Sequence, residues 1–302
     1  MEKKASLSQI EWRLKKTGET SDSRGRTLWK YVFAPSQFTR TNLIFLFSRK
    51  TQPIKNKNII LKRFTPSEIS PELLAKMEAF LKEVQPDLPD NHLAKNHLHK
   101  KNIELFVFFL NEEIVAITSF TGHWTKHPSN GKKVFVAMGG LTYKKPVEGL
   151  RKVTKTVSRI YMKKHLGPLW LFKPFIGMIT TVNPKLYGQF QNFFEEKYPN
   201  KSTKTPENIR AFSEETLGIL EGHETTLNEN LVTADDPRYP DLSDITEEYA
   251  QLYDSNSERL NNFFIENGVH VVKDDKIYLS SKAALTVGFY KPGRGLLRAL
   301  KK

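Results

Sequence analysis

The sequence contains no cysteine among its 302 residues, which excludes disulfide bonds, thiolate metal sites, cysteine nucleophiles and thiol redox chemistry. Long apolar runs are also missing. The longest, residues 166–182, is interrupted by Lys173, two prolines and two glycines, and it is shorter than the roughly 20 apolar residues that a membrane-spanning helix needs. The N-terminal residues have no apolar core of the signal-peptide type. We therefore predict a soluble, cytoplasmic protein.

Several catalytic and metal-binding patterns are absent as well. The sequence has no HExxH, no phosphate-binding loop of the GxxxxGK[ST] type and no GxSxG. His92, His97 and His99 lie close together, and the spacing of the last two is typical of side chains on one face of a strand. Their surroundings are rich in lysine, and Asp90 is the one acidic residue nearby. We predict no metal site here.

The charge that is present is strongly positive and unevenly distributed. Lys and Arg total 47 against 33 acidic residues, a net charge of +14. Residues 1–50 carry 11 basic and 4 acidic side chains, residues 151–200 carry 9 and 2, and residues 201–250 carry 4 and 12. Such a field favours an anionic partner, which is a phosphorylated cofactor, an anionic membrane surface or nucleic acid. The alternative is a well-solvated surface without a partner.

Composition and periodicity divide the chain into three regions. Hydrophobic residues make up 38%, enough for a globular core, and the length suits about two domains. Residues 1–57 form a basic N-terminal extension, residues 58–200 are strongly patterned, and residues 201–302 form an α+β region that begins with an acidic linker. In this last region we predict helices over 243–253 and 257–266, a hairpin of 269–272 with 276–279, and a turn over the glycine-containing string 288–295.

The middle region alternates strands and helices in the order β-α-(α)-β-β-β-α-β-α. Ser70 and Pro71 form a helix start, with serine as the cap and proline in the first turn. Asn111 to Glu113 separate two β runs and predict a hairpin. The predicted strands are 58–64, 104–109, 114–120, 134–143 and 175–182, and the predicted helices follow Ser70, span 148–166, and run from 183 to 198.

This order of elements resembles the GNAT superfamily of acetyltransferases. Its members have a helix pair after the first strand, a central antiparallel meander, a strand–helix unit that grips the cofactor, and a final strand–helix unit. The resemblance covers about 140 residues. It implies an α/β (α+β) fold with a mixed, mostly antiparallel central sheet flanked by helices, here followed by a C-terminal α+β appendage.

The resemblance also implies where a cofactor binds. After its fourth strand the family has a glycine-containing turn whose backbone approaches the pyrophosphate at a helix N-terminus. Here Gly149 remains, Arg151 stands where a second small residue is usual, and lysines cluster at the turn. An ordinary strand-to-helix turn with a solvated basic surface is the alternative. The implied acyl-CoA contacts are Leu141, Tyr143, Lys144, Lys145, Gly149, Leu150, Arg151 and Lys152.

The last strand–helix unit supplies further candidates through the same resemblance. Asn183 stands where the family often has an asparagine that faces the pantetheine arm. Tyr187 is the nearest candidate for the general acid that protonates the leaving thiolate, although it is earlier than the family's usual place. Alternatively, Asn183 caps its helix and Tyr187 packs. Glu104 and His123 are candidates for the base that deprotonates the acceptor.

We therefore predict an acyltransferase that uses acetyl-CoA or another acyl-CoA and transfers the acyl group by direct attack of an amine or other small acceptor. No metal is expected. The alternative is a non-catalytic protein of the same fold that binds an anionic partner through its basic surface. That partner would be a membrane surface, through residues 42–50, 169–175 and 296–302, or nucleic acid. Nucleic acid is the less favoured of the two, because no basic stripe interleaved with aromatic residues and no known binding motif is present.

Overall fold

The computed structural model of the chain describes residues 59–86, 88–145, 153–200, 204–222, 224–234, 255, 257–273 and 276–292. The predicted N-terminal extension, the helix predicted over 243–253 and the basic end at 296–302 lie outside these residues. The described strands are β1 (Ile59–Phe64), β2 (Glu104–Leu110), β3 (Glu113–Lys126), β4 (Lys133–Lys144), β5 (Phe175–Thr181), β6 (Glu196–Tyr198), β7 (His270–Lys273), β8 (Lys276–Leu279) and β9 (Ala284–Tyr290). The described helices are η2 (Pro66–Glu68), α3 (Pro71–Val84), α4 (His92–Asn96), α5 (Val153–Leu166), η4 (Trp170–Phe172), α6 (Pro184–Gln191), α7 (Glu207–Glu221) and α9 (Glu258–Glu266).

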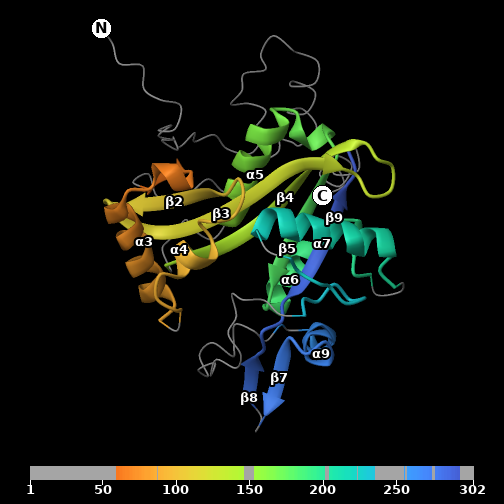
Figure 1. Cartoon of the computed structure of the whole chain (residues 1–302). Coiled ribbons are helices and arrows are strands. Elements are labelled where there is room, and N and C mark those ends of the chain that lie inside the picture. The colour runs from red at the N-terminus through yellow and green to blue at the C-terminus, as the bar shows by residue number, and fades with distance from the viewer. Residues whose placement is uncertain are drawn as a thin grey trace, which may run out of the picture.

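Seven of the strands form one sheet in the order β1-β2-β3-β4-β5-β9-β6, and β7 and β8 form a separate hairpin (Figure 1). From β1 to β4 every neighbouring pair is antiparallel, whereas β4 and β5 are parallel. The pairs β5–β9 and β9–β6 are antiparallel again. The predicted fold class, a mixed and mostly antiparallel sheet flanked by helices, is confirmed.

Local sequence signals account for many element boundaries. Ser70 caps α3 by accepting a hydrogen bond from the Leu73 N–H at 3.2 Å, and Pro71 is the first helical residue. Asn111 and Glu112 form the turn between β2 and β3 with φ values of 50° and 69°, as a two-residue hairpin turn requires. The predicted hairpin is therefore confirmed. However, β3 continues to Lys126, beyond the end predicted at residue 120, because it pairs with β4 along this whole extension.

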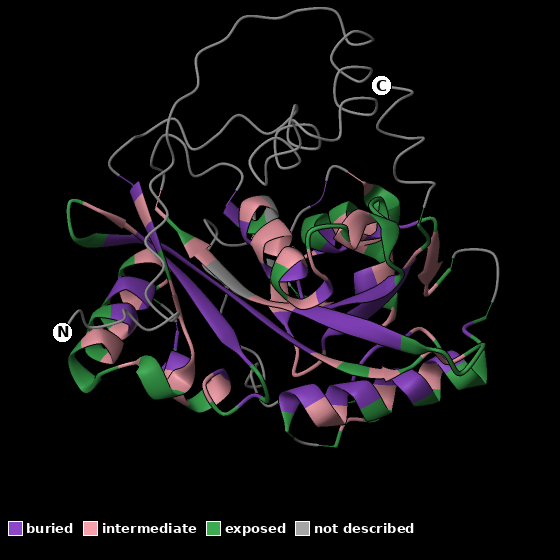
Figure 2. Ribbon diagram, turned by 90° about the horizontal axis from the view of Figure 1, so that it is seen from above, coloured by how far each residue is buried: buried purple, intermediate pink, exposed green. Residues whose placement is uncertain are grey.

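Helices cover both faces of the sheet (Figure 2). One face is covered by α5 and α6. Val157 and Tyr161 of α5, together with Phe194 just after α6, pack in one cluster with Phe106 and Phe135 of the sheet. The other face is covered by α3 and α4 over β2 and β3, and by α7 over β4, β5 and β9. The central strands are consequently buried on both faces.

The element order is that of a GNAT-like fold. A first strand, β1, is followed by the helix pair α3 and α4, then by the antiparallel meander β2-β3-β4, and then by α5, β5 and α6. Each element that the resemblance implies between residues 58 and 191 is thus present and in order. The parallel pair β4–β5, with α5 as its crossover connection, is the part of this fold that matters most below.

The C-terminal region contributes a strand to the central sheet. β9 pairs with β5 from Phe175↔Tyr290 to Thr181↔Ala284. The turn predicted over 288–295 is wrong at its start, because Gly288 to Tyr290 belong to this strand. Gly288 is required here by packing rather than by a turn: a Cβ at this position would lie 2.2 Å from the ring of Phe194. The boundary drawn at residue 200 therefore separates strands of one sheet.

Three further differences concern the chain after Val182. The helix that begins at Pro184 ends at Gln191, rather than continuing to 198, and β6 follows it. The acidic segment after residue 200, expected to be a linker, contains the helix α7, which buries Ile209, Phe212 and Leu220. By contrast, α9 and the β7–β8 hairpin occupy the predicted positions.

The contact between Gly288 and Phe194 gives a stability prediction. We expect Gly288→Ala to lower the free energy of unfolding by about 1–3 kcal/mol, because the added methyl group forces the buried Phe194 ring out of its position. Urea unfolding followed by circular dichroism measures this loss. Gly139→Ala in the same sheet is the matched control, since the nearest atom to its added Cβ lies 4.0 Å away. Equal stability of the two variants would contradict the prediction.

Candidate functional site

The parallel strands β4 and β5 separate at one edge of the sheet. Their pairing begins at Phe135↔Phe175 and its last pair is Gly139↔Ile179. β4 continues to Lys144 and β5 to Thr181 without pairing with each other. Beyond Gly139, β4 pairs only with β3 among the described residues. The two strands thus stop pairing before their carboxyl ends, and we call this place the β4–β5 opening.

A bulge in β4 lies at the base of this opening. Gly139 pairs with Phe120 and Thr142 pairs with Thr118, so that Ser119 alone faces two residues of β4. An extra residue in one strand bends it and increases its local twist. Gly140 fits this bulge because a Cβ there would lie 2.1 Å from the Ser119 Oγ. The bulge therefore accounts for the departure of β4 from β5.

The carboxyl end of β5 is fixed by local hydrogen bonds. The Asn183 N–H donates to the Thr181 Oγ1 at 3.0 Å, and the Asn183 Oδ1 accepts from the Leu186 N–H at 3.0 Å. Asn183 is therefore the N-cap of α6, followed by Pro184 in the first turn. Because the carboxyl ends of two parallel strands meet at one edge, Asn183 and the segment 141–145 lie at the same edge of the sheet, as the sequence predicts.

The predicted cofactor-binding residues of β4 differ in their surroundings. The Lys144 side chain is exposed, whereas the Lys145 Nζ forms an ion pair with Glu83 of α3 at 2.7 Å. Tyr143 is half-buried against the cluster beneath α3. Lys144 is thus the more available of the two cations. Leu141 belongs to the β4 backbone at the opening, and the predicted contacts Gly149, Leu150, Arg151 and Lys152 lie outside the described residues.

Tyr187 lies in the hydrophobic core between α6 and α9. It is 2% exposed, its ring stacks on Phe263 and packs edge-on against Phe264, and its hydroxyl accepts a hydrogen bond from the Gln191 Nε2 at 3.1 Å. Burial raises the pKa of Tyr187 far above its ordinary range. The phenol is therefore protonated but enclosed, and this placement favours a packing role over proton donation at the opening.

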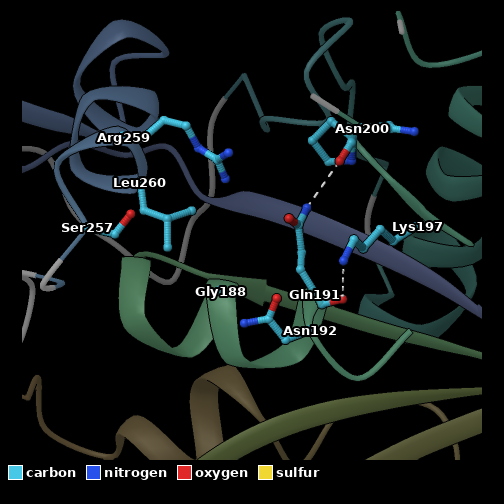
Figure 3. Close-up of a pocket in the computed structure, with 9 residues that line it drawn as sticks. Gly188, Gln191, Asn192, Lys197, Asn200, Ser257, Arg259 and Leu260 are labelled. Carbon is cyan, nitrogen blue, oxygen red and sulfur yellow. Dashed lines mark hydrogen bonds between the residues drawn. The ribbon is translucent and has the colours of Figure 1, made fainter. Parts of the chain in front are cut away.

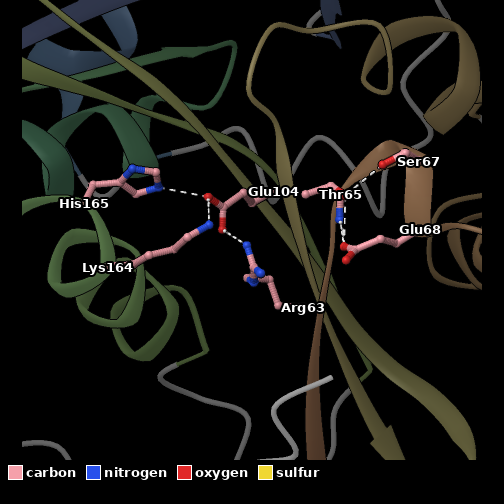
Figure 4. A network of polar contacts seen from close by, with 7 residues as sticks. All are labelled: Arg63, Thr65, Ser67, Glu68, Glu104, Lys164 and His165. Atoms are coloured by element: carbon pink, nitrogen blue, oxygen red, sulfur yellow. Dashed lines mark hydrogen bonds and ion pairs between the residues drawn. The ribbon is translucent and has the colours of Figure 1, made fainter. Parts of the chain in front are cut away.

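Glu104 forms a buried ion cluster that joins three elements (Figure 4). Its Oε2 accepts a hydrogen bond from the Arg63 Nη1 of β1 at 3.1 Å. Its Oε1 accepts from the Lys164 Nζ at 2.6 Å and from the His165 Nε2 at 2.8 Å, both in the last turn of α5. The Glu104 side chain is only 6% exposed. The carboxylate thus ties the end of α5 to the first two strands.

The same contacts determine the charge of Glu104. Burial alone would raise its pKa, but the hydrogen bonds from His165, Lys164 and Arg63 outweigh burial and lower the pKa from 4.5 to about 2. A carboxylate with this pKa and three donors is a weak base. Glu104 aligns with Phe120 and, through it, with Gly139, two strands away or about 10 Å. Its geometry favours positioning of α5 over proton abstraction.

His123 lies on β3 and on the opposite face from Glu104. Its neighbour in register is Val136, which packs beneath α7. Both ring nitrogens are buried and form no hydrogen bond with any described residue. Burial and the charge of Lys101 lower the pKa of His123, which keeps the ring neutral at pH 7. The structure brings His123 and Glu104 together only at the lining of a cavity of about 330 Å³, where β3 extends beyond β2.

The histidines near α4 are held by one another and by the chain. His92 and His97 share a hydrogen bond between their Nε2 atoms at 3.2 Å, and the His99 Nε2 donates to the Glu221 carbonyl oxygen at 3.2 Å. Within the described ranges, no group of three or more histidine, aspartate or glutamate residues has the arrangement of a metal site.

Among the residues that the structure describes, no helix is both long enough and apolar enough to cross a bilayer.

Sequence reasoning missed the residues that act on Glu104 and the residue that faces the bulge. Arg63, Lys164 and His165 are 41 to 61 positions away from Glu104 in the sequence. A cationic last helical turn is a general stabilising feature and gives no sign of its partner. Ser119 carries no signal at all, because a bulge depends on the register between two strands. The glycine pair at 139–140 was the one available indication.

Comparison with known proteins finds similarity in structure alone. No protein-family model matches the chain, and no curated protein is similar to it in sequence. An acetyl-CoA-bound GNAT-family acetyltransferase from Elizabethkingia anophelis is 9% identical, with 77% of this chain and 99% of that chain covered and a TM-score of 0.32. The ribosomal-protein-alanine N-acetyltransferase from Brucella melitensis is 12% identical, with 37% and 74% covered and a TM-score of 0.27.

A conserved Enterococcus faecalis protein of unknown function is also similar. It is 13% identical, with a TM-score of 0.32, and the match spans 44% of this chain but only 31% of that chain. Sequence identities and TM-scores this low describe only a general likeness in fold. The statement that the fold is GNAT-like therefore rests on the strand order and pairing described above.

The Glu104 cluster predicts a pH dependence of stability. Because its pKa is lower in the folded chain than the ordinary 4.5, Glu104 stabilises the fold fully above about pH 4.5, and this contribution is lost as the pH falls toward 2. The pKa difference corresponds to about 3 kcal/mol. We expect Glu104→Gln to reduce the free energy of unfolding at pH 7 by an amount of this order, and by less than half as much at pH 3. Urea unfolding at the two pH values measures the difference.

The matched control for this experiment is Glu113→Gln, because Glu113 is an exposed carboxylate at the start of β3. It should leave stability unchanged at both pH values. If Glu104→Gln destabilised the chain equally at pH 7 and pH 3, the loss would come from packing and not from the ion cluster.

Proposed function

We propose that this chain transfers an acyl group from an acyl-CoA thioester to an amine, at the β4–β5 opening. The observation that carries the proposal is the end of β4–β5 pairing at Gly139↔Ile179 while both strands continue. The ends of both strands are here free of each other, so that unpaired strand backbone borders the place between them. The pantetheine arm of coenzyme A is a narrow chain with two amide groups, and it suits such a place.

The backbone of β4 would hold the substrate in two ways. Between Gly140 and Lys144 the strand edge toward β5 has no partner strand among the described residues, so its N–H and C=O groups are available to the pantetheine amides. A strand N–H next to the thioester would stabilise the oxyanion that forms when the amine attacks. The amine first forms the new C–N bond, and the carbonyl electron pair moves onto the oxygen. The amine then loses a proton to water, and the oxyanion re-forms the C=O bond as the C–S bond breaks and coenzyme A leaves as the thiolate.

Positive charge near the opening supports binding of the coenzyme A phosphates. From Ile114 to Phe194 the sequence has 13 Lys and Arg residues and one acidic residue, Glu148. The exposed Lys144 lies at the end of β4, and α5 begins at Val153 shortly afterwards. Gly149, Leu150, Arg151 and Lys152 remain predicted phosphate contacts on the basis of the sequence. Cations and helix N-terminal amides are the usual ligands of phosphate groups.

This scheme requires none of the candidate general acids and bases. Tyr187 is enclosed, Glu104 is held by three donors, and His123 lies on the other face of the sheet. A water chain can accept the proton of the amine, and a thiolate is an adequate leaving group by itself. We therefore propose that the chain acts by orientation and by oxyanion stabilisation.

Binding of acetyl-CoA tests this proposal directly. We expect acetyl-CoA to raise the thermal unfolding temperature in a saturable way, since a ligand at 100 times its dissociation constant adds about 2.7 kcal/mol. Dephospho-CoA should give a smaller rise. Lys144→Glu should weaken the effect at least several-fold, because it places a negative charge where the phosphates approach the end of β4. Differential scanning fluorimetry over a range of ligand concentrations measures both effects.

The control is Lys76→Glu, an equal charge change at an exposed position of α3 on the other face of the sheet. It should leave the acetyl-CoA effect unchanged. Absence of any shift with acetyl-CoA in the unmodified chain would overturn the proposed function.

A second candidate function, docking on an anionic membrane surface, is favoured by an exposed apolar cluster. Leu169, Phe172 and Phe193 are 51%, 46% and 53% exposed. They are joined through Tyr290, which stacks on Phe193 and donates a hydrogen bond to the Leu171 carbonyl oxygen. The exposed Lys173 follows directly. Exposed aromatic and aliphatic side chains beside lysine are typical of surfaces that insert shallowly into anionic bilayers.

Vesicle sedimentation tests this candidate. We expect binding to vesicles that contain phosphatidylserine and little binding to phosphatidylcholine alone, with a several-fold loss in Phe172→Asp. Val272→Asp, at an equally exposed apolar residue of β7, is the control and should bind normally. Equal sedimentation of the unmodified chain with both kinds of vesicle would rule out an anionic surface as the partner.

A further inference from the structure

A second cavity lies at the C-terminal end of α6 (Figure 3). Its volume is about 600 Å³, within the range of small-molecule sites. The end of α6, the chain that follows β6 and the start of α9 surround it. Its polar lining residues are Gln191, Asn192, Lys197, Asn200, Ser257 and Arg259.

The chemistry of this lining is one-sided. Two of the six polar residues are cations, three are amides and one is a hydroxyl, and no described residue of the lining carries a carboxylate. The remaining described lining residues are apolar or glycine. A cavity with this composition disfavours cations and favours an anion that also bears hydrogen-bonding groups.

Gln191 is held so that its oxygen is available to a ligand. The side chain is buried, with 9% exposed, and its Nε2 donates to the Pro199 carbonyl oxygen and to the Tyr187 hydroxyl, both at 3.1 Å. A carbonyl oxygen can only accept, so the Nε2 must face Pro199, and the Oε1 is on the other side. No described residue donates to this Oε1. It is an acceptor that a ligand hydroxyl can satisfy.

Arg259 supplies the charge. Its side chain extends over the cavity in Figure 3 and forms no hydrogen bond or ion pair with another described residue. Lys197 lies across the cavity, where its Nζ donates to the main-chain carbonyl oxygen of Gln191 at 2.8 Å. The planar guanidinium matches the geometry of a phosphate or carboxylate oxygen pair.

We propose that this cavity binds a phosphate monoester of a hydroxyl-bearing small molecule. Arg259 and Lys197 hold the phosphate, and Gln191, Asn192 and Asn200 hold the hydroxyl groups. The site is separate from the proposed acyl-CoA site, because Asn183 at the start of α6 and Gln191 at its end are about 12 Å apart along the helix axis. The proposal does not depend on acyl transfer.

Isothermal titration calorimetry with ribose 5-phosphate, inorganic phosphate and ribose tests the proposal on the full chain. We expect ribose 5-phosphate to bind more tightly than phosphate, and ribose to bind weakest. Arg259→Glu should weaken binding of ribose 5-phosphate at least tenfold, and Asn192→Asp, which changes charge with almost no change of shape, should weaken it several-fold. Lys76→Glu, with the same charge change as Arg259→Glu on the far face of the sheet, should bind normally.

Three results would overturn the proposal. The first is no heat with ribose 5-phosphate in the unmodified chain, and the second is equal binding by the unmodified chain and by folded Arg259→Glu and Asn192→Asp. The third is loss of ribose 5-phosphate binding when acetyl-CoA saturates the chain, which would make the phosphate contact part of the acyl-CoA site. Since acetyl-CoA binding is measured separately by its thermal shift, failure of one proposal is distinguishable from failure of the other.

Discussion

The parallel pairing of β4 with β5, and its early end, is the constraint on which the rest of the structure depends. β5 meets β4 over five residue pairs but meets β9 over seven, along its whole length. β4 is in turn held by β3 up to Lys144. Each strand therefore has a full partner on its outer side, and the two can separate at their carboxyl ends without either becoming an unsupported strand. The opening is stable because β9, from the far end of the sequence, closes the sheet beyond it.

The charges of α5, the helix that covers one face of the sheet, also affect the β4–β5 opening. α5 carries four Lys or Arg residues and no acidic residue, and the buried carboxylate of Glu104 forms ion pairs with Lys164 of α5 and with Arg63 of β1. Two of the three partners of Glu104, Lys164 and His165, lie in the last turn of α5, so the ion cluster fixes the end of the helix that is remote from the opening. Cations nearer the opening, such as Lys144, are not neutralised in this way. One carboxylate thus fixes the end of the helix and leaves the charge of Lys144 at the strand end available to the proposed anionic substrate.

The parts of the fold that sequence reasoning predicted are those with local signals. The cap at Ser70, the turn at Asn111 and the cap at Asn183 are set by neighbours within a few residues, and so the β-α-β order and the shared edge of 141–145 and Asn183 followed. β9 was missed because Gly288 and Gly293 resemble turn residues, whereas burial of β9 on both faces removes the alternation that marks a strand. α7 was hidden by its acidic surface, although its apolar residues recur at helical spacing. The partners of Glu104 and the bulge opposite Ser119 depend on register and long-range packing, which no local pattern encodes.

The helix α6 connects the two proposed sites. Its first residues cap at Asn183 beside the β4–β5 opening, and its last residues, Gln191 and Asn192, line the donor-rich cavity. Between them Tyr187 packs on Phe263 and Phe264 and accepts a hydrogen bond from Gln191. The same Gln191 amide donates to Pro199, so that the orientation of its oxygen toward the cavity is set by Tyr187 from within the core. The residue that the family resemblance marks as an acid is therefore better understood as the support that holds one end of α6 against α9. The two proposed sites lie at opposite ends of this helix, about 12 Å apart along its axis, so we expect a ligand at one site to leave the other unchanged.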